Sequence, residues 1–265
     1  MLDIDIAVVT HAGKVRTHNE DSVLFVRPSD PEVLGKHGVM GLVADGMGGH
    51  KAGEHASRLA VETITRSYFD SREEPRQALL DAFASANGAV FEAAVEEPAW
   101  KGMGTTCVAV AVCRDLMWWA WVGDSRMYLL RRGTLFRMTE DHTVVQDMVR
   151  RGWMTQEEAA MHDDRNILDR AIGTRDAVET GICDSAMRLE EGDRLVLCSD
   201  GLHDLIRDEE MAQWAGEGCA HECADKLLEM ALTRGGQDNI SVVVLEAKAK
   251  TAERKARMTR ESVVA

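Results

Sequence analysis

The sequence predicts an α+β protein: a four-layer sandwich in which two antiparallel β-sheets pack together and pairs of α-helices flank them. Short apolar or alternating runs recur along the 265 residues, and tight turns join many of them. Amphipathic helical stretches come between these runs, often in pairs. No change of composition divides the body of the chain, so we expect residues 1–246 to form one domain.

The expected strands are bounded by turn signals. Arg114 and Asp115 separate two of the runs, and the turn from Arg131 to Gly133 separates two others. Such short connections are typical of hairpins, and hairpins make antiparallel sheet. The expected strands cover residues 5–10, 22–26, 38–44, 105–113, 116–122, 127–131, 194–198 and 240–246.

The expected helices follow from apolar residues at helical spacing. One of them begins with a capping box, because Thr155 is followed three residues later by Glu158. The expected helices cover residues 52–67, 75–97, 142–151, 155–161, 208–215 and 221–234.

The last segment, residues 247–265, differs from the body because it carries six basic and two acidic residues. We expect a solvated, frayed tail. Docking of this tail on an acidic partner or an anionic lipid surface is the alternative.

Composition excludes some classes of function. The formal net charge of −14 argues against nucleic acid as the main partner. Apolar stretches such as 103–113 are too short to cross a bilayer, and the N-terminus lacks the basic flank of a signal peptide. Several of the six cysteines lie in apolar runs, as reduced thiols do. We therefore expect a cytoplasmic protein that does not insert into membranes and acts as a monomer.

The stretch VADGMGGHKAG, residues 43–53, places a bare carboxylate, Asp45, where an apolar strand ends in a glycine-rich turn. Glycines at such a place can cradle a phosphate or free a backbone carbonyl for a metal ion. A P-loop would need Ser or Thr after Lys51, but Ala52 follows. The metal site is therefore the better interpretation.

Other acidic residues recur at strand ends beside a glycine or a turn. A single case would be an ordinary turn residue, but sheet strands could bring several to one rim. Clustered carboxylates repel one another unless a cation neutralises them, and their oxygens suit Mn²⁺ or Mg²⁺. These residues are Glu20, Asp21, Asp124, Asp200 and Asp238.

Arg16 lies four residues before Glu20, so it reaches the same rim. Its planar guanidinium can bind two oxygens of one phosphate. Divalent cations beside such an arginine are suited to attack by water on a phosphorus centre.

Eight segments in order carry a resemblance that covers about residues 5–246. The segments are GKVRTHNED, VADGMGGHKAGEHAS, GTT at 104–106, WVGDSRMYLL, EDHTVV, RNILDRAIG, LCSDGLHD and GGQDNISVVV. With these segments the chain resembles the bacterial single-domain, metal-dependent protein phosphatases of type 2C, which are specific for phosphoserine and phosphothreonine.

The resemblance assigns a role to each candidate residue. It implies that Asp45 bridges two Mn²⁺ or Mg²⁺ ions and that a water between the ions is the nucleophile. By the same resemblance, the Gly46 carbonyl would join one ion, Asp200 and Asp238 would bind the first, and Asp21 with Glu20 would hold the second largely through waters. Asp124 would join Asp200 around a third ion, and Arg16 would bind the substrate phosphate.

The resemblance leaves two features open. Met47 stands where animal members carry a proton-donating histidine, so a water, His50 or His162 would have to protonate the leaving group. His142 is expected to hold a turn. Residues 143–165 correspond to the family's flap, which we expect either to govern substrate choice or to be a packed helical hairpin.

The resemblance implies a phosphorylated protein substrate, either a Ser/Thr kinase or its target. One alternative is a phosphatase of a small phosphorylated metabolite. Another is a catalytically silent scaffold that binds a phosphoprotein. The presence of Arg16 and of every candidate acid favours the enzyme.

Overall fold

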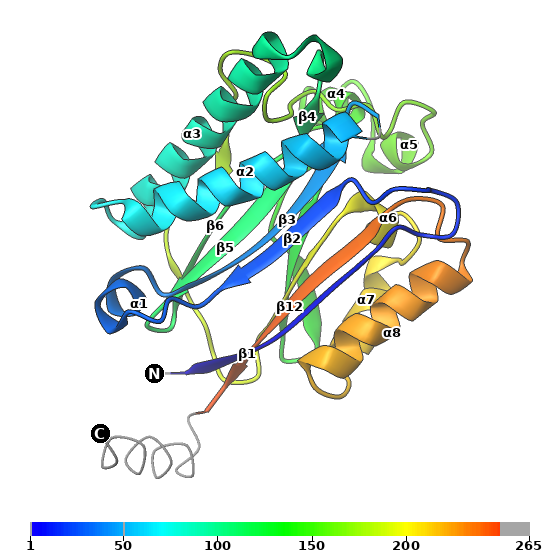
Figure 1. Cartoon of the computed structure of the whole chain (residues 1–265). Helices are drawn as coiled ribbons and strands as arrows, with labels where there is room; N and C mark the ends of the chain where they lie inside the picture. Colours follow the sequence, from blue (N-terminus) through cyan, green and yellow to red (C-terminus); the bar gives the residue numbers. More distant parts are fainter. Residues whose placement is uncertain (1, 50, 250–265) are drawn as a thin grey trace.

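The computed structural model describes residues 2–49 and 51–249 and confirms the expected sandwich of two antiparallel sheets (Figure 1). One sheet contains, in order, β1 (Asp3–His11), β12 (Ile240–Lys248), β11 (Arg194–Cys198), β7 (Arg126–Arg131) and β8 (Thr134–Arg137). The other contains, in order, β10 (Met187–Arg188), β6 (Leu116–Val122), β5 (Cys107–Cys113), β3 (Val39–Met47) and β2 (Asp21–Val26). Two short strands extend this second sheet: β4 (Gly104–Thr105) pairs with β3, and β9 (Gly181–Ile182) pairs with β6.

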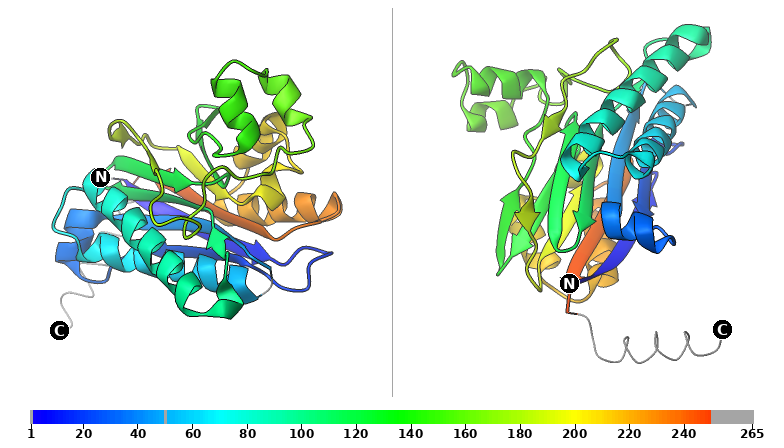
Figure 2. Two further views of the ribbon diagram at one scale, coloured as in Figure 1. Left: turned by 90° about the horizontal axis from the view of Figure 1, so that it is seen from above. Right: turned by 90° about the vertical axis from the view of Figure 1, so that its left-hand side faces the viewer.

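Helices cover the outer face of each sheet. Long helices α2 (Lys51–Asp70) and α3 (Pro75–Glu96) cover the second sheet, and η1 (Pro98–Trp100) follows them. The first sheet is covered by α6 (Asp200–His203), α7 (Asp208–Ala215) and α8 (Ala220–Thr233). Helices α4 (Val144–Arg150) and α5 (Gln156–Ala160) project from the body in both views of Figure 2. The remaining helix, α1 (Pro31–His37), lies at the end of the molecule away from them.

Helices on both outer faces explain why many strands read as continuous apolar runs. Neighbouring residues of one strand are buried on opposite sides: in β3, Leu42 packs under the helices and Val43 packs between the sheets. All seven residues of β5 are buried. The period-two pattern is lost because neither face of a central strand meets water.

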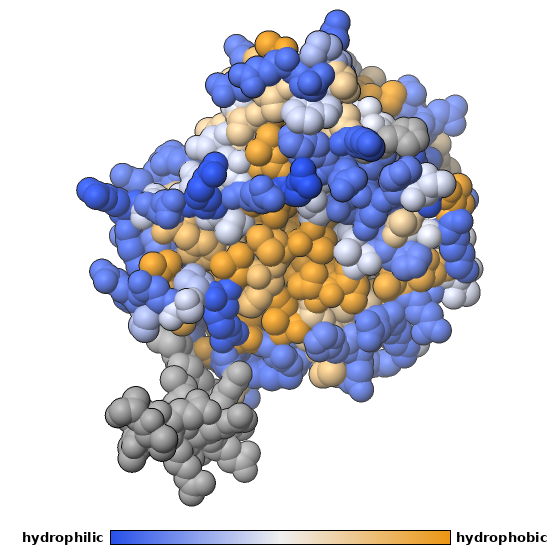
Figure 3. Space-filling model, in the orientation of Figure 1, coloured by the Kyte–Doolittle hydropathy of each residue, from blue (hydrophilic) through white to orange (hydrophobic). Residues whose placement is uncertain are grey.

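The open edge of the sandwich is formed by β1 and β2. Val8 is 37% exposed there, and Ile6, Val23 and Phe25 are only partly buried. Figure 3 shows apolar surface gathered over this part of the molecule.

Several boundaries differ from those expected. β12 continues to Lys248, two residues beyond the expected strand 240–246, because Ala247 pairs with Ile4 and Lys248 with Asp3. Residues 250–265 of the tail lie outside the described residues. α1 and α6 are not among the expected helices. Asp30 as N-cap and Pro31 at the first helical position mark the start of α1, whereas α6 has only four residues.

α3 is long and apolar enough by composition to cross a membrane. In the fold, it is the partner of α2, and its apolar face is buried, including Leu79, Phe83 and Val90. Its composition therefore matches a core helix as well as a membrane span.

The carbonyl of His37, the last residue of α1, is one of the groups that a helix end leaves without an intrahelical partner. The hydroxyl of Tyr68 donates to it at 2.9 Å, and Tyr68 is completely buried. Burial also raises the pKa of Tyr68, which keeps the hydroxyl a donor.

We expect Tyr68→Phe to lower the free energy of unfolding by about 1–2 kcal/mol, since the buried carbonyl then lacks a donor. Urea unfolding followed by circular dichroism measures this change. An unchanged free energy would contradict a stabilising role for the hydrogen bond.

Candidate active site

A cavity of about 560 Å³ lies at the end of the sandwich where β3 ends and β12 begins. Seven of the eight site residues expected from the sequence line it: Arg16, Glu20, Asp45, Gly46, Asp124, Asp200 and Asp238. The eighth, Asp21, lies beneath, buried to 8% exposure.

Strand register brings these acids to one end. Cys198 at the end of β11 pairs with Val242 and with Arg126, so the residues just beyond those strand ends meet. In the other sheet, Asp21 at the start of β2 pairs directly with Asp45 near the end of β3. Antiparallel pairing therefore places starts and ends of alternate strands at the same rim.

The backbone of Asp45 is fixed by the two threonines of the GTT segment. Its N–H donates to Thr106 Oγ1 at 3.0 Å. Its carbonyl accepts from the Thr106 N–H and from Thr105 Oγ1, both at 2.8 Å. Both threonines are buried, so the position of Asp45 is determined by the core.

Gly46 has to be glycine because two other backbone segments pass beside it. A Cβ there would lie 2.1 Å from the Gly53 carbonyl oxygen and 2.6 Å from that of Glu20. The Gly46 N–H donates to the same Glu20 carbonyl at 3.2 Å. A Cβ on Gly53 would lie 1.9 Å from Glu20 Oε2. The glycines therefore let α2 begin against the acids.

Asn239 holds the loop that carries Arg16 and Glu20, and sequence reasoning missed this residue. Its Oδ1 accepts from the Glu20 N–H at 2.7 Å, and its Nδ2 donates to the carbonyls of Ala12 and His18. Asn239 is only 5% exposed. The signal that could have identified Asn239 is its position: it is a polar amide directly before an apolar strand.

Ser199, also missed, supports Asp21. Its hydroxyl donates to Asp21 Oδ2 at 2.8 Å and accepts from the Ser241 N–H at 3.0 Å. Oδ1 of Asp21 and Oδ1 of Asp200 are buried and have no hydrogen-bond partner among the described residues. Buried carboxylate oxygens without a donor are costly unless a cation binds them.

The carboxylates resist ionisation in this setting. Burial raises the pKa of Asp21 to about 7, with the charges of Asp200 and Asp238 adding to the effect. Burial, followed by repulsion from neighbouring carboxylates, also raises the pKa of Asp45 and of Asp124. The pKa of Asp200 is raised mainly by burial. A divalent cation would reverse this balance by favouring the charged forms.

The donor set fits a hard divalent cation, since it consists of several carboxylates with unpaired oxygens. The side chains do not form a finished coordination shell. In the described part of the chain, no three acidic, histidine or cysteine side chains are spaced to hold a metal ion. Support for a cation therefore comes from the chemistry and burial of the oxygens.

Arg16 lies over the acids. Its Nη2 donates to Asp238 Oδ2 at 2.7 Å, and its side chain is 56% exposed. The ion pair orients the guanidinium at the cavity, and more than half of the Arg16 side chain stays exposed to solvent.

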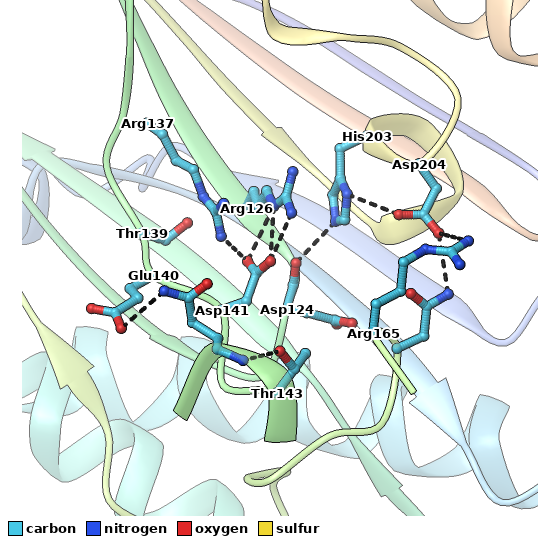
Figure 4. A network of polar contacts seen from close by, with 12 residues as sticks. Asp124, Arg126, Arg137, Thr139, Glu140, Asp141, Thr143, Arg165, His203 and Asp204 are labelled. Atoms are coloured by element: carbon cyan, nitrogen blue, oxygen red, sulfur yellow. Dashed lines mark hydrogen bonds and ion pairs between the residues drawn. The ribbon is translucent and has the colours of Figure 1, made fainter. Parts of the chain in front are cut away.

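The Asp124 carbonyl belongs to a polar network that reaches the residues after α5 (Figure 4). His203 Nε2 donates to the Asp124 carbonyl at 3.0 Å, and Asp204 accepts from Asn166 Nδ2 at 3.1 Å. Beside them, Arg126 makes a bidentate ion pair with Asp141, whose pKa it lowers against the effect of burial. Through Asn166, the segment after α5 is thus bound to the end of α6, the helix that begins at Asp200.

The candidate histidines are not equivalent. His162 does not line the cavity; its Nδ1 accepts from the Asp164 N–H at 3.1 Å. His50 lies outside the described residues. His142 holds the turn at Gly123, since its Nδ1 accepts the Gly123 N–H at 3.3 Å and its own N–H donates to the Gly123 carbonyl.

Comparison with known proteins gives a consistent result. A family model described as protein phosphatase 2C matches residues 11–234. The serine/threonine protein phosphatase PstP of Mycobacterium tuberculosis is 40% identical over 235 residues, which cover 88% of this chain and 43% of PstP. The serine/threonine phosphatase stp of Listeria welshimeri is 36% identical over 245 residues, which cover 89% of this chain and 93% of stp.

Solved structures agree with the sequence matches. The M. tuberculosis PstP/Ppp structure has a TM-score of 0.82 and 35% identity and covers 94% of this chain and 100% of that chain. A structure of the PstP catalytic domain in complex with two manganese ions has a TM-score of 0.80, 35% identity and the same coverage of both chains.

Burial, followed by the charge of Arg170, lowers the pKa of His142 from 6.5 to about 4. Between these values the unfolded chain takes up a proton that the folded protein does not. Stability should therefore fall as the pH drops from 6.5 towards 4, by up to about 3 kcal/mol from this residue.

We expect His142→Gln to reduce this pH dependence, because glutamine cannot take up the proton. Urea unfolding at several pH values between 4 and 7 measures the slope. The exposed His221→Gln is the matched control and should leave the slope unchanged. An equal slope in wild type and His142→Gln would contradict the assignment.

Proposed function

The chain belongs to the protein phosphatase 2C family, and on this premise we propose that it hydrolyses phosphoserine and phosphothreonine in proteins. The observation that carries the proposal is the cavity in which buried carboxylates with unpaired oxygens lie beneath an exposed arginine. In the reaction, a water oxygen bonds to phosphorus and the ester P–O bond breaks. The alcohol takes a proton, and inorganic phosphate is released.

The proposed metal ligands are the buried acids. Asp45 would contact both of two Mn²⁺ or Mg²⁺ ions, with the Gly46 carbonyl on one of them. Asp200 and Asp238 would hold one ion, and Asp21 and Glu20 the other, with Glu20 acting through water. Asp124 and Asp200 would share any third ion. When bound, these cations would neutralise the acids, lower the pKa of a nucleophilic water and stabilise charge on the phosphoryl group. Two manganese ions in the PstP structure support the proposal.

The chain's own residues position the reaction. Arg16 would bind two oxygens of the substrate phosphate, with Asp238 orienting its guanidinium. Thr105 and Thr106 fix the backbone of Asp45, and Ser199 aims Asp21. Rigid donors and acceptors of this kind hold the substrate phosphorus close to the line of attack.

We propose that residues 1–246, with the two further residues of β12, form the catalytic domain. The substrate is proposed to be a phosphoprotein, either a Ser/Thr kinase or its target, and the setting the cytoplasm. Six free cysteines, five of them buried, suit a reducing compartment. The net charge of −14 disfavours nucleic acid. The protein is also proposed to be a monomer that does not insert into a membrane.

We expect metal-stripped protein to regain phosphate release from a phosphothreonine peptide as Mn²⁺ is added. Asp45→Asn should lower kcat/KM by at least about 100-fold, since a central ligand is lost. Asp225→Asn, exposed on α8, is the matched control and should retain full activity. Mn²⁺ should also raise the melting temperature of wild type more than that of Asp45→Asn.

A phosphotyrosine peptide and small phosphorylated metabolites are the comparison substrates in this assay. Turnover confined to metabolites would favour the metabolite phosphatase. Binding of phosphopeptides without turnover, in folded protein that responds to Mn²⁺, would favour the silent scaffold.

The segment 143–165 is proposed to govern substrate choice. It projects from the body (Figure 2), and the residues just after it, Asn166 and Leu168, line the cavity. Replacing 143–165 with a relative's flap should change the preference among phosphopeptides by more than it changes turnover of a small aryl phosphate. Equal changes in both would indicate a packed hairpin without a role in selection.

A further inference from the structure

The segment 171–176, which follows the flap, is fixed on two sides at the rim of the cavity. On one side, Ile172 exchanges two backbone hydrogen bonds with Thr105, at 2.8 and 3.0 Å. The hydroxyl of Thr105 also donates to the Asp45 carbonyl. Thr105 therefore connects the segment to the central acid.

On the other side, Asn87 of α3 makes three hydrogen bonds to the segment. Its Oδ1 accepts from the Gly173 N–H at 2.9 Å, and its Nδ2 donates to the carbonyls of Arg175 and Asp176, both at 3.1 Å. Asn87 is only 2% exposed. A buried amide with both ends engaged gives the segment one conformation.

Gly173 lets the segment approach α3 this closely. Its φ is +85°, and a Cβ would lie 2.2 Å from Val90 Cγ1. The chain therefore turns sharply here and presents the next residues to solvent.

Arg175 is an exposed residue of this fixed segment. It lines the cavity. The named cavity residues include two cations, Arg16 and Arg175, beside the carboxylates of Glu20, Asp45, Asp124, Asp169, Asp200 and Asp238. Arg16 is paired with Asp238, whereas Arg175 has no acidic partner within residues 2–49 and 51–249. The backbone at Arg175 is fixed, and its exposed guanidinium, which has no acidic partner in the described residues, is available to an anion from outside.

We propose that Arg175 forms a second anion subsite, which binds a negatively charged group next to the phosphorylated residue of the substrate. The assignment depends on the proposed phosphatase function and specifies its substrate class: phosphopeptides with an acidic or second phosphorylated neighbour. The planar fork of arginine fits a carboxylate or a phosphate equally.

The test uses the full chain loaded with Mn²⁺ and phosphothreonine peptides that differ at one neighbouring position. That position carries alanine, glutamate, lysine or a non-hydrolysable phosphonate, and it is moved along both sides of the phosphothreonine. The glutamate and phosphonate arms distinguish the two sources of negative charge. We expect the best acidic peptide to exceed the alanine peptide by about fivefold in kcat/KM, as for an exposed ion pair.

Arg175→Ala should remove this advantage, and Arg175→Glu should transfer it to the lysine peptide. Arg175→Ala should lower turnover of a small aryl phosphate much less than turnover of the acidic peptide, because the aryl phosphate has no neighbouring acidic group. Arg72→Ala, an exposed arginine between α2 and α3, is the matched control and should behave as wild type. High salt should reduce the advantage of the acidic peptide.

Equal rates for all peptides in wild type, or an acidic advantage that survives in Arg175→Ala, would overturn the subsite. Failure of the proposed function is separable, since it would appear as no turnover even of the aryl phosphate. In that case, the subsite is tested by measuring the binding affinity of peptides that carry a non-hydrolysable phosphonate at the central residue. Tighter binding of the acidic peptide that is lost in Arg175→Ala supports the subsite, and equal binding overturns it.

Discussion

The burial of several carboxylates side by side, with the repulsion between them, is the constraint on which the rest of this structure depends. Asp21, Asp45, Asp124 and Asp200 lie where burial and neighbouring charges raise the pKa of each. Such a cluster destabilises the fold unless a cation binds it. The sandwich therefore has to hold the acids together against burial and repulsion, and the result is a site whose oxygens suit a divalent cation.

The core provides that support through backbone contacts. Strand pairing sets Asp21 opposite Asp45, and threonine hydroxyls hold the main chain of Asp45 from the neighbouring strand. Ser199 and Asn239 act similarly on Asp21 and on the loop with Arg16. The stability of the apolar core thus holds the carboxylates in an arrangement that they would not adopt without it.

Polar side chains also connect the cavity to the elements around it. Asn166 binds Asp204 below the flap, and Asn87 fixes the segment that carries Arg175. Both amides join a surface segment to the rigid body through satisfied hydrogen bonds. The rim is thus ordered where a substrate peptide would lie, while the helices of the flap project from the body.

The sequence by itself determined the fold class, most strands and helices, and the set of acids at strand ends, because apolar period and turn chemistry are local properties. Sequence reasoning missed α1, although Asp30 and Pro31 mark its start, and α6, which has only four residues. It also missed the end of β12, which the pairing with β1 decides. Only the tertiary structure placed Asp21 beneath the cavity, excluded His162 from its lining and assigned tasks to Asn239 and Asn87. These depend on contacts between residues distant in sequence, and no local pattern carries that information.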